Sequence, residues 1–208
     1  MNKKFLTIAI GILFFFGAKY GVEYWQDQDR YSEAQEEARD AFNELKEVAS
    51  DRKEGELESE AIKRAATDKV NDLIQSQETL LEQKKAAAST FMGFYLVNSR
   101  ERSKFCDQHN IDIASFTTKF DNLHKAEYEL ASKYLFTKSF SLEDLYQLIN
   151  EQLEEVIKTD MRDIANTYTN GSFSEACVLI KDQGDVFVES IHVAKVLPKI
   201  YETLHKEE

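Results

Sequence analysis

The sequence predicts an all-α protein, and three observations support this fold class. The chain of 208 residues contains only 1 Pro and 7 Gly. A sheet protein needs turn signals such as Gly, Pro or Asn-Gly every ~8–12 residues, and this chain lacks such a series. Hydrophobic residues make up 42% of the chain and aromatic residues 12%, which is enough to fill a core. Apolar residues also recur at spacings of three and four, which is the period of an amphipathic helix.

An apolar helix is predicted for residues 1–25. Lys3 and Lys4 give a basic start, and the segment from Phe5 to Trp25 would form a helix about 31 Å long at ~1.5 Å per residue. This length spans the hydrocarbon of a bilayer, so the segment is interpreted as an uncleaved signal anchor, a single transmembrane helix. The apolar residues assigned to this anchor are Phe5, Leu6, Ile8, Ile10, Ile12, Leu13, Phe14, Phe15 and Phe16.

A cleaved signal peptide is the alternative for the same segment. Such a peptide also has a basic start and an apolar region, but it needs small residues one and three positions before the cut. A cut after Ala18 places Phe16 at the third position, and a cut after Gly21 places Lys19 there. Both fit poorly, so the anchor is favoured. The basic start keeps the N-terminus in the cytoplasm, and either outcome sends the rest of the chain across the membrane.

Residues 26–84 are predicted to form a helical, coiled-coil-like stalk. Its first seam has heptad spacing and consists of Tyr31, Ala34, Ala38, Ala41, Leu45 and Val48. The wholly polar stretch 50–56 contains Gly55 and predicts a break. A second run with the same spacing extends from Val70 to Phe94. The simplest interpretation is an antiparallel helical hairpin, and the alternative is that the two runs pair with another chain.

Residues 85–208 are richer in aromatic residues and are predicted to form a four-helix-type bundle. The aromatic stripe 91–95 lies in the first helix of this bundle and is interpreted as core. The second helix is predicted from Phe116 to Tyr134, because its apolar residues follow helical spacing.

The third bundle helix has clear start and stop signals. Ser141 and Asp144 resemble a capping box, and Asn170-Gly171 suits a helix end because Gly tolerates the left-handed conformation there. Ser172 opens a short helix. A last helix follows through Phe187 and is predicted to kink or end at Pro198.

The chain contains only two cysteines, Cys106 and Cys177. In an oxidising compartment such a pair predicts one disulfide, which would stabilise the fold by roughly 4 kcal/mol in the chain-entropy model. Two independent buried thiols are the alternative. A metal site is a further alternative, in which Cys106, His109 and Cys177 bind zinc with another histidine. The sequence has only one tight ligand pair, Cys106 and His109, so the metal site is the weaker interpretation.

The acidic charge and the missing motifs exclude several function classes. The formal charge is −12, and the three lysines and one glutamate of residues 1–25 carry +2, so residues 26–208 carry −14. Such a surface repels phosphate backbones, so nucleic acid binding is not expected. No phosphate loop, metalloprotease motif or nucleophile elbow is present. The acidic pair Asp160 and Asp163 is interpreted as part of a solvated helix face.

These observations predict a non-enzymatic, membrane-anchored, extracytoplasmic interaction protein, such as an adaptor, assembly factor or scaffold of a cell envelope. The expected location is the bacterial inner membrane, with the bulk facing the periplasm, and secretion to the periplasm is the alternative. A protein partner or self-association is expected. The seam is the expected contact surface, either within the chain or with a partner. No cofactor or small-molecule substrate is expected. A ligand- or lipid-binding helical ectodomain is the first functional alternative, and the metal-binding protein is the second.

Overall fold

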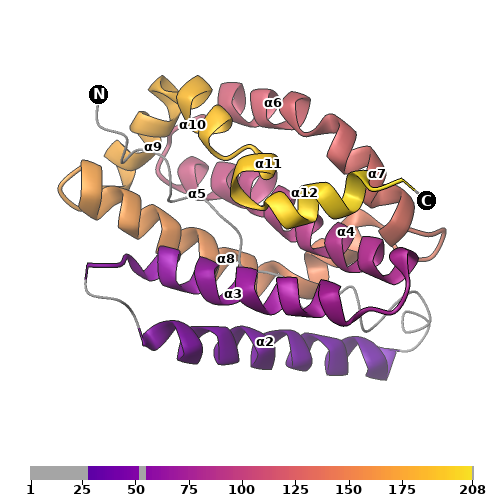
Figure 1. The fold of residues 1–208 in the computed structure, drawn as a ribbon. Helices are drawn as coiled ribbons and strands as arrows, with labels where there is room; N and C mark the ends of the chain where they lie inside the picture. Colours follow the sequence, from indigo (N-terminus) through magenta and orange to yellow (C-terminus); the bar gives the residue numbers. More distant parts are fainter. Residues whose placement is uncertain (1–27, 52–54, 208) are drawn as a thin grey trace.

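A computed structural model describes residues 28–51 and 55–207, and these ranges are helical apart from turns and one isolated antiparallel bridge between Thr137 and Phe140. The all-α prediction is therefore confirmed for the described chain (Figure 1). In chain order the helices are α2 (Gln28–Ser50), α3 (Glu58–Ser76), α4 (Leu80–Leu96), the π-helix η2 (Val97–Glu101), α5 (Arg102–Gln108), α6 (Ala114–Leu123), α7 (Lys125–Leu135), α8 (Leu142–Tyr168), α9 (Phe173–Asp182), α10 (Gly184–Ser190), α11 (Val193–Val196) and α12 (Pro198–His205).

Helices α2 and α3 lie side by side in antiparallel directions, and α2 also packs on α8 (Figure 1). Between the two helices, Gly55 adopts a φ of 77°. This left-handed conformation is strained for residues other than glycine. This explains why the polar stretch interrupts the helix at that point. Because α3 packs on both α4 and α8, the helices of the predicted stalk and of the predicted bundle share one hydrophobic core.

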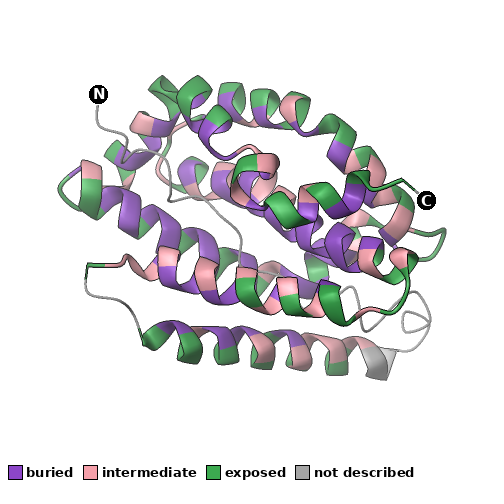
Figure 2. Ribbon diagram, in the orientation of Figure 1, coloured by how far each residue is buried: buried purple, intermediate pink, exposed green. Residues whose placement is uncertain are grey.

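Helix α4 lies at the centre of this core. It packs against α3, α7, α8 and α12, and nearly all residues from Ala86 to Leu96 are buried (Figure 2). Phe91 and Phe94 have no exposed surface, and their rings contact each other and His124. The aromatic stripe 91–95 is therefore core, as its composition predicts.

Two of the predicted bundle helices are divided in the structure. The helix expected from Phe116 to Tyr134 is split into α6 and α7 at His124, whose ψ of 14° departs from helical geometry. The last predicted helix consists of α10, α11 and α12. Pro198 begins α12, where a missing N–H costs nothing because the first amides of a helix have no intrahelical acceptor.

The capping box at the start of α8 is present as predicted. The Ser141 hydroxyl accepts a hydrogen bond from the Asp144 amide at 3.3 Å, and the Asp144 carboxylate accepts one from the Ser141 amide at 2.8 Å. Ser141→Ala should therefore lower the free energy of unfolding by about 1 kcal/mol. Urea unfolding would measure the loss. Glu151→Ala, at an exposed position of the same helix, is the matched control, and an equal loss in both variants would contradict the capping role.

Within residues 28–51 and 55–207, no helix combines the length and the apolar character that a membrane crossing requires. The predicted anchor, with its residues between Phe5 and Phe16, lies outside the described residues.

Candidate interaction surface

The segment formed by η2 and α5 carries polar residues on two faces, one directed to the core and one to the surface. At Arg102 the amide donates its hydrogen bond to the carbonyl of Val97, five residues back, as in a π-helix. Single π-turns of this kind are uncommon and often occur at functional sites. The wider turn brings Asn98, Glu101 and Arg102 to the interior, where each is at most 1% exposed.

The inner face of this segment is built around Arg102, which is fully buried. Its Nη2 donates to Oδ2 of Asp160 at 2.7 Å, and Nε and Nη2 donate to Oδ1 of Asn98 at 3.3 Å and 3.1 Å. The Asn98 amide in turn donates to the carbonyl of Phe94 at 2.9 Å. This network joins η2 and α5 to α8 through the core.

The buried surroundings of Asp160 shift the pKa of its carboxyl group. Burial raises its pKa to about 6, while the Arg102 guanidinium opposes this shift. Its second oxygen, Oδ1, has no hydrogen-bond partner among the described residues. Asp163 is also buried and accepts a hydrogen bond from the Ser59 amide at 2.8 Å. The prediction that these two aspartates belong to a solvated helix face is therefore wrong, because both form contacts with other helices.

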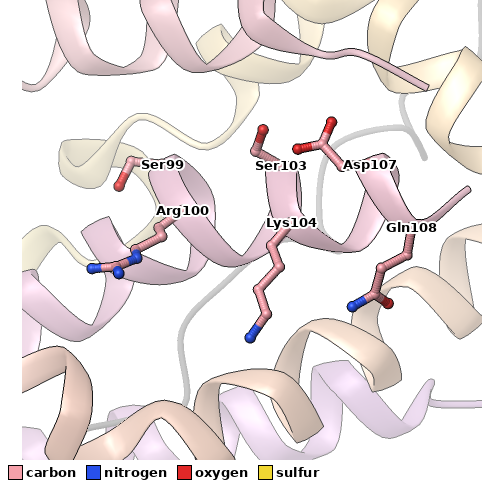
Figure 3. A pocket seen from close by; sticks show the side chains of 6 residues that line it. All are labelled: Ser99, Arg100, Ser103, Lys104, Asp107 and Gln108. Carbon is pink, nitrogen blue, oxygen red and sulfur yellow. The ribbon is translucent and has the colours of Figure 1, made fainter. Parts of the chain in front are cut away.

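The outer face of the same segment lines an open surface pocket. Figure 3 shows Arg100, Lys104 and Gln108 extending together toward one side of the helix, with Ser99, Ser103 and Asp107 along its other edge. All six lining residues are polar or charged. The pocket therefore presents hydrogen-bond donors and acceptors rather than an apolar surface.

The two cations of the pocket are held by carboxylates of α8. Arg100 donates to both oxygens of Glu143, at 2.7 Å and 3.4 Å, and its guanidinium lies 3.4 Å from the centre of the Tyr146 ring. Lys104 pairs with Glu154. The hydrogen bond to Glu143 raises the pKa of Arg100, and the hydrogen bond to Glu154 raises that of Lys104, so both side chains are cationic at neutral pH.

Tyr146 connects the pocket to the interior. Its hydroxyl donates to Oε1 of the buried Glu101 at 2.5 Å, and Lys104 lies 3.7 Å from the other oxygen of the same carboxylate. Burial raises the pKa of Tyr146, as does the hydrogen bond to Glu101. Arg100 and Lys104 are thereby held on α8 by ion pairs, hydrogen bonds and a cation–π contact.

One end of the pocket segment is covalently tied to α9. Cys106 and Cys177 form a disulfide with their Cα atoms 5.5 Å apart, and both residues are fully buried. The sequence predicted this bond. His109 lies against the rings of Phe105 and Phe173, at 5.0 Å and 5.7 Å between centroids. The disulfide uses both sulfurs that the metal-binding alternative needs, and the part of the chain described contains no group of three potential metal ligands.

The predicted interaction seam lies within the chain rather than on its surface. Ala38 and Leu45 are buried, while Tyr31, Ala34 and Ala41 are partly buried against the core. The seam departs from its predicted register at the end of α2. There Val48 is 55% exposed, and Phe42 and Ala49 are buried instead. Helices α3 and α8 therefore cover the face of α2 that the heptad pattern predicts as a contact surface.

Sequence reasoning missed the pocket, since nothing in the pattern around residues 97–108 distinguishes it from an ordinary amphipathic helix. The signal that exists is the close succession of Arg100, Arg102 and Lys104 in a chain of net charge −12. Two of these cations line the pocket and the third lies in the core.

Comparison with protein-family models, with curated proteins and with solved structures found no match for this chain.

Proposed function

We propose that this chain is a non-enzymatic, membrane-anchored, extracytoplasmic interaction protein that acts as an adaptor, assembly factor or scaffold in a cell envelope. The observation that supports this proposal most directly is the polar pocket on η2 and α5. Its side chains offer charged and neutral hydrogen-bonding groups, of which Arg100 and Lys104 are paired with α8. A disulfide and a buried ion pair hold the backbone beneath them.

A protein partner with a polar contact surface fits this pocket best. Interfaces between separately stable proteins are about as polar as the rest of the surface, and arginine is enriched at their centres. The large hydrophobic side chains exposed among the described residues are few and lie on four different helices; they are Val48, Leu81, Val178 and Val186. The proposed contact is therefore polar and reversible.

The disulfide and the predicted anchor are the two observations that support the proposed location. Structural disulfides persist in oxidising compartments and are rare in a reducing cytosol. An exported body fixed to the bacterial inner membrane by residues 1–25 would acquire this bond in the periplasm, and secretion after cleavage gives the same result. Protease treatment of spheroplasts is the test of topology: degradation of residues 26–208 from outside supports the proposal, and full protection refutes it.

The pocket can be tested by site-specific crosslinking in intact membranes. A photoreactive residue in place of Gln108, which is exposed at the end of α5, should capture one defined protein. The matched control is the same residue in place of Leu81, which is 52% exposed on α4. Equal capture at both positions, or at neither, would count against the pocket as a contact surface.

The role of Arg100 in this contact can be measured separately. Arg100→Ala should weaken association with the captured protein by about tenfold, since truncation of an arginine at an interface centre costs about 1–2 kcal/mol. Arg39→Ala on α2 removes another exposed arginine and should leave association unchanged. Binding assays with the purified partner compare the two variants, and equal affinities would contradict the assignment.

A further inference from the structure

Three of the four histidines of the chain gather where α7, α11 and α12 meet. The ring of His124 lies 5.3 Å from the ring of His192, between centroids. The ring of Tyr201 lies 6.2 Å from that of His192 and 4.4 Å from that of His205. Nothing in the proposed contact surface uses this cluster.

Both ring nitrogens of His124 form hydrogen bonds with backbone groups. The side chain is fully buried, with Nδ1 3.0 Å from the carbonyl of Phe120, which can only accept a hydrogen bond. Nδ1 must therefore carry the proton. Nε2 lies 3.1 Å from the amide of Val193, which can only donate. These two contacts fix a single tautomer and require a neutral ring.

His192 is likewise a hydrogen-bond acceptor, for the next backbone amide of α11. Its Nδ1 accepts a hydrogen bond from the amide of Ala194 at 3.1 Å. The first two amides of α11 are thus satisfied by lone pairs of two imidazoles. A proton on either nitrogen removes the acceptor and places an N–H group against an N–H group.

We propose that residues 192–197, the α11 latch, form an acid-sensitive segment that opens when the buried His124, which accepts the hydrogen bond of its Val193 amide, becomes protonated. The latch precedes α12, which packs on α4 and α7 and buries Ile200 and Leu204. Opening it loosens the connection between α10 and the C-terminal helix.

Most other titratable groups on the surrounding helices already have partners. Tyr95 of α4 hydrogen-bonds to Asp121 of α6. Lys84 of α4 donates to the Tyr134 hydroxyl of α7 at 3.1 Å. Lys195 of α11 pairs with Glu189 of α10 at 3.5 Å. Lys119 of α6 pairs with Asp185 of α10, and Tyr128 of α7 stacks on Tyr95.

Glu127 is the group that opposes opening. Its carboxylate is buried, and its Oε1 lies 3.2 Å from Nε2 of His205 at the end of α12. A protonated His205 forms an ion pair with this carboxylate. This contact holds the end of α12 on α7 without using the latch, so opening begins at α11.

The size of the effect follows from linkage. Burial lowers the pKa of His124 to about 4, with the neighbouring His192 acting in the same direction and Glu127 against it. The closed form thus binds a proton less tightly than an open form with an ordinary histidine, and closure is lost as the pH falls. His124 in the open form has an ordinary pKa of about 6.5. The population of the open latch should therefore rise about 20-fold between pH 7 and pH 5.

Hydrogen exchange on the full, disulfide-bonded chain in detergent tests this proposal. Rates at pH 7 and pH 5 are corrected for the intrinsic effect of pH on exchange. The peptide covering residues 192–197 should lose protection about 20-fold, while a peptide from residues 145–156 of α8 should not. Equal changes in both peptides, or no change in the latch, would overturn the proposal.

Two variants separate protonation from a general loss of stability. His192→Asn keeps an acceptor for the Ala194 amide, and His124→Gln offers an oxygen to Val193, but neither side chain titrates in this range. His124→Gln should therefore reduce the dependence on pH, whereas His192→Asn leaves His124 in place and should retain most of it. His109→Gln removes a histidine at the far end of α5 and should behave as the unmodified protein. A pH response that persists in full in His124→Gln would refute the proposal, and if that variant fails to fold, complete loss of the response in His192→Asn would refute it.

Discussion

Replacing Asp160 by Asn is expected to lower the free energy of unfolding by about 3–5 kcal/mol, because it leaves the buried guanidinium of Arg102 without a counter-charge. The ion pair spans 2.7 Å and its two side chains are 0% and 5% exposed. Arg102 has no route to water and cannot lose its proton. Urea unfolding at pH 7 measures the loss.

A matched control exists on the outside of the same segment. Arg100 and Glu143 form an ion pair of the same length, but their side chains are 41% and 57% exposed. Arg100→Gln should therefore cost less than about 1 kcal/mol. The double variant Arg102→Met with Asp160→Leu should recover much of the loss, since an apolar pair of similar volume replaces a buried ion pair at little cost. A loss in Asp160→Asn no larger than in Arg100→Gln would contradict this account.

Removing the disulfide is the second change with a large expected effect. Replacing both Cys106 and Cys177 by Ala should lower the free energy of unfolding by about 4 kcal/mol, because the bond closes a loop between residues separated by 71 positions in sequence. A domain with a total stability of about 5–15 kcal/mol would lose a large part of it.

The experiment compares urea midpoints of the double variant with those of the oxidised chain. A second measurement treats the oxidised chain with a reductant under native conditions, where both buried sulfurs should resist reduction until the protein unfolds. An unchanged midpoint in the double variant would show that the bond contributes little to stability, and rapid reduction of the folded protein would contradict the burial of its sulfurs.

The sequence predicted those features that short-range signals specify. The break at Gly55, the start of α8 at Ser141 and the buried face of α2 all depend on residues a few positions apart. The Cys106–Cys177 bond was predictable for a different reason, since only one pairing exists within the chain.

The candidate site could not be predicted, because its features depend on long-range contacts. Arg102 and Asp160 are 58 residues apart and resemble residues of a solvated face when each is seen in its own helix. The π-turn that buries Arg102 has no distinct sequence pattern. His124 similarly follows the apolar spacing of a continuous helix, and its role depends on an amide 69 residues further along.

The complete burial of both sulfurs also sets an order of events during biogenesis. An oxidant must reach Cys106 and Cys177 before α5, α8 and α9 close around them, because the finished core admits no catalyst. Cys177 is synthesised after Cys106, so the first thiol stays reduced at least until the intervening chain has been made. A cell that delayed oxidation would therefore accumulate a trapped, bond-free form that only unfolding could repair.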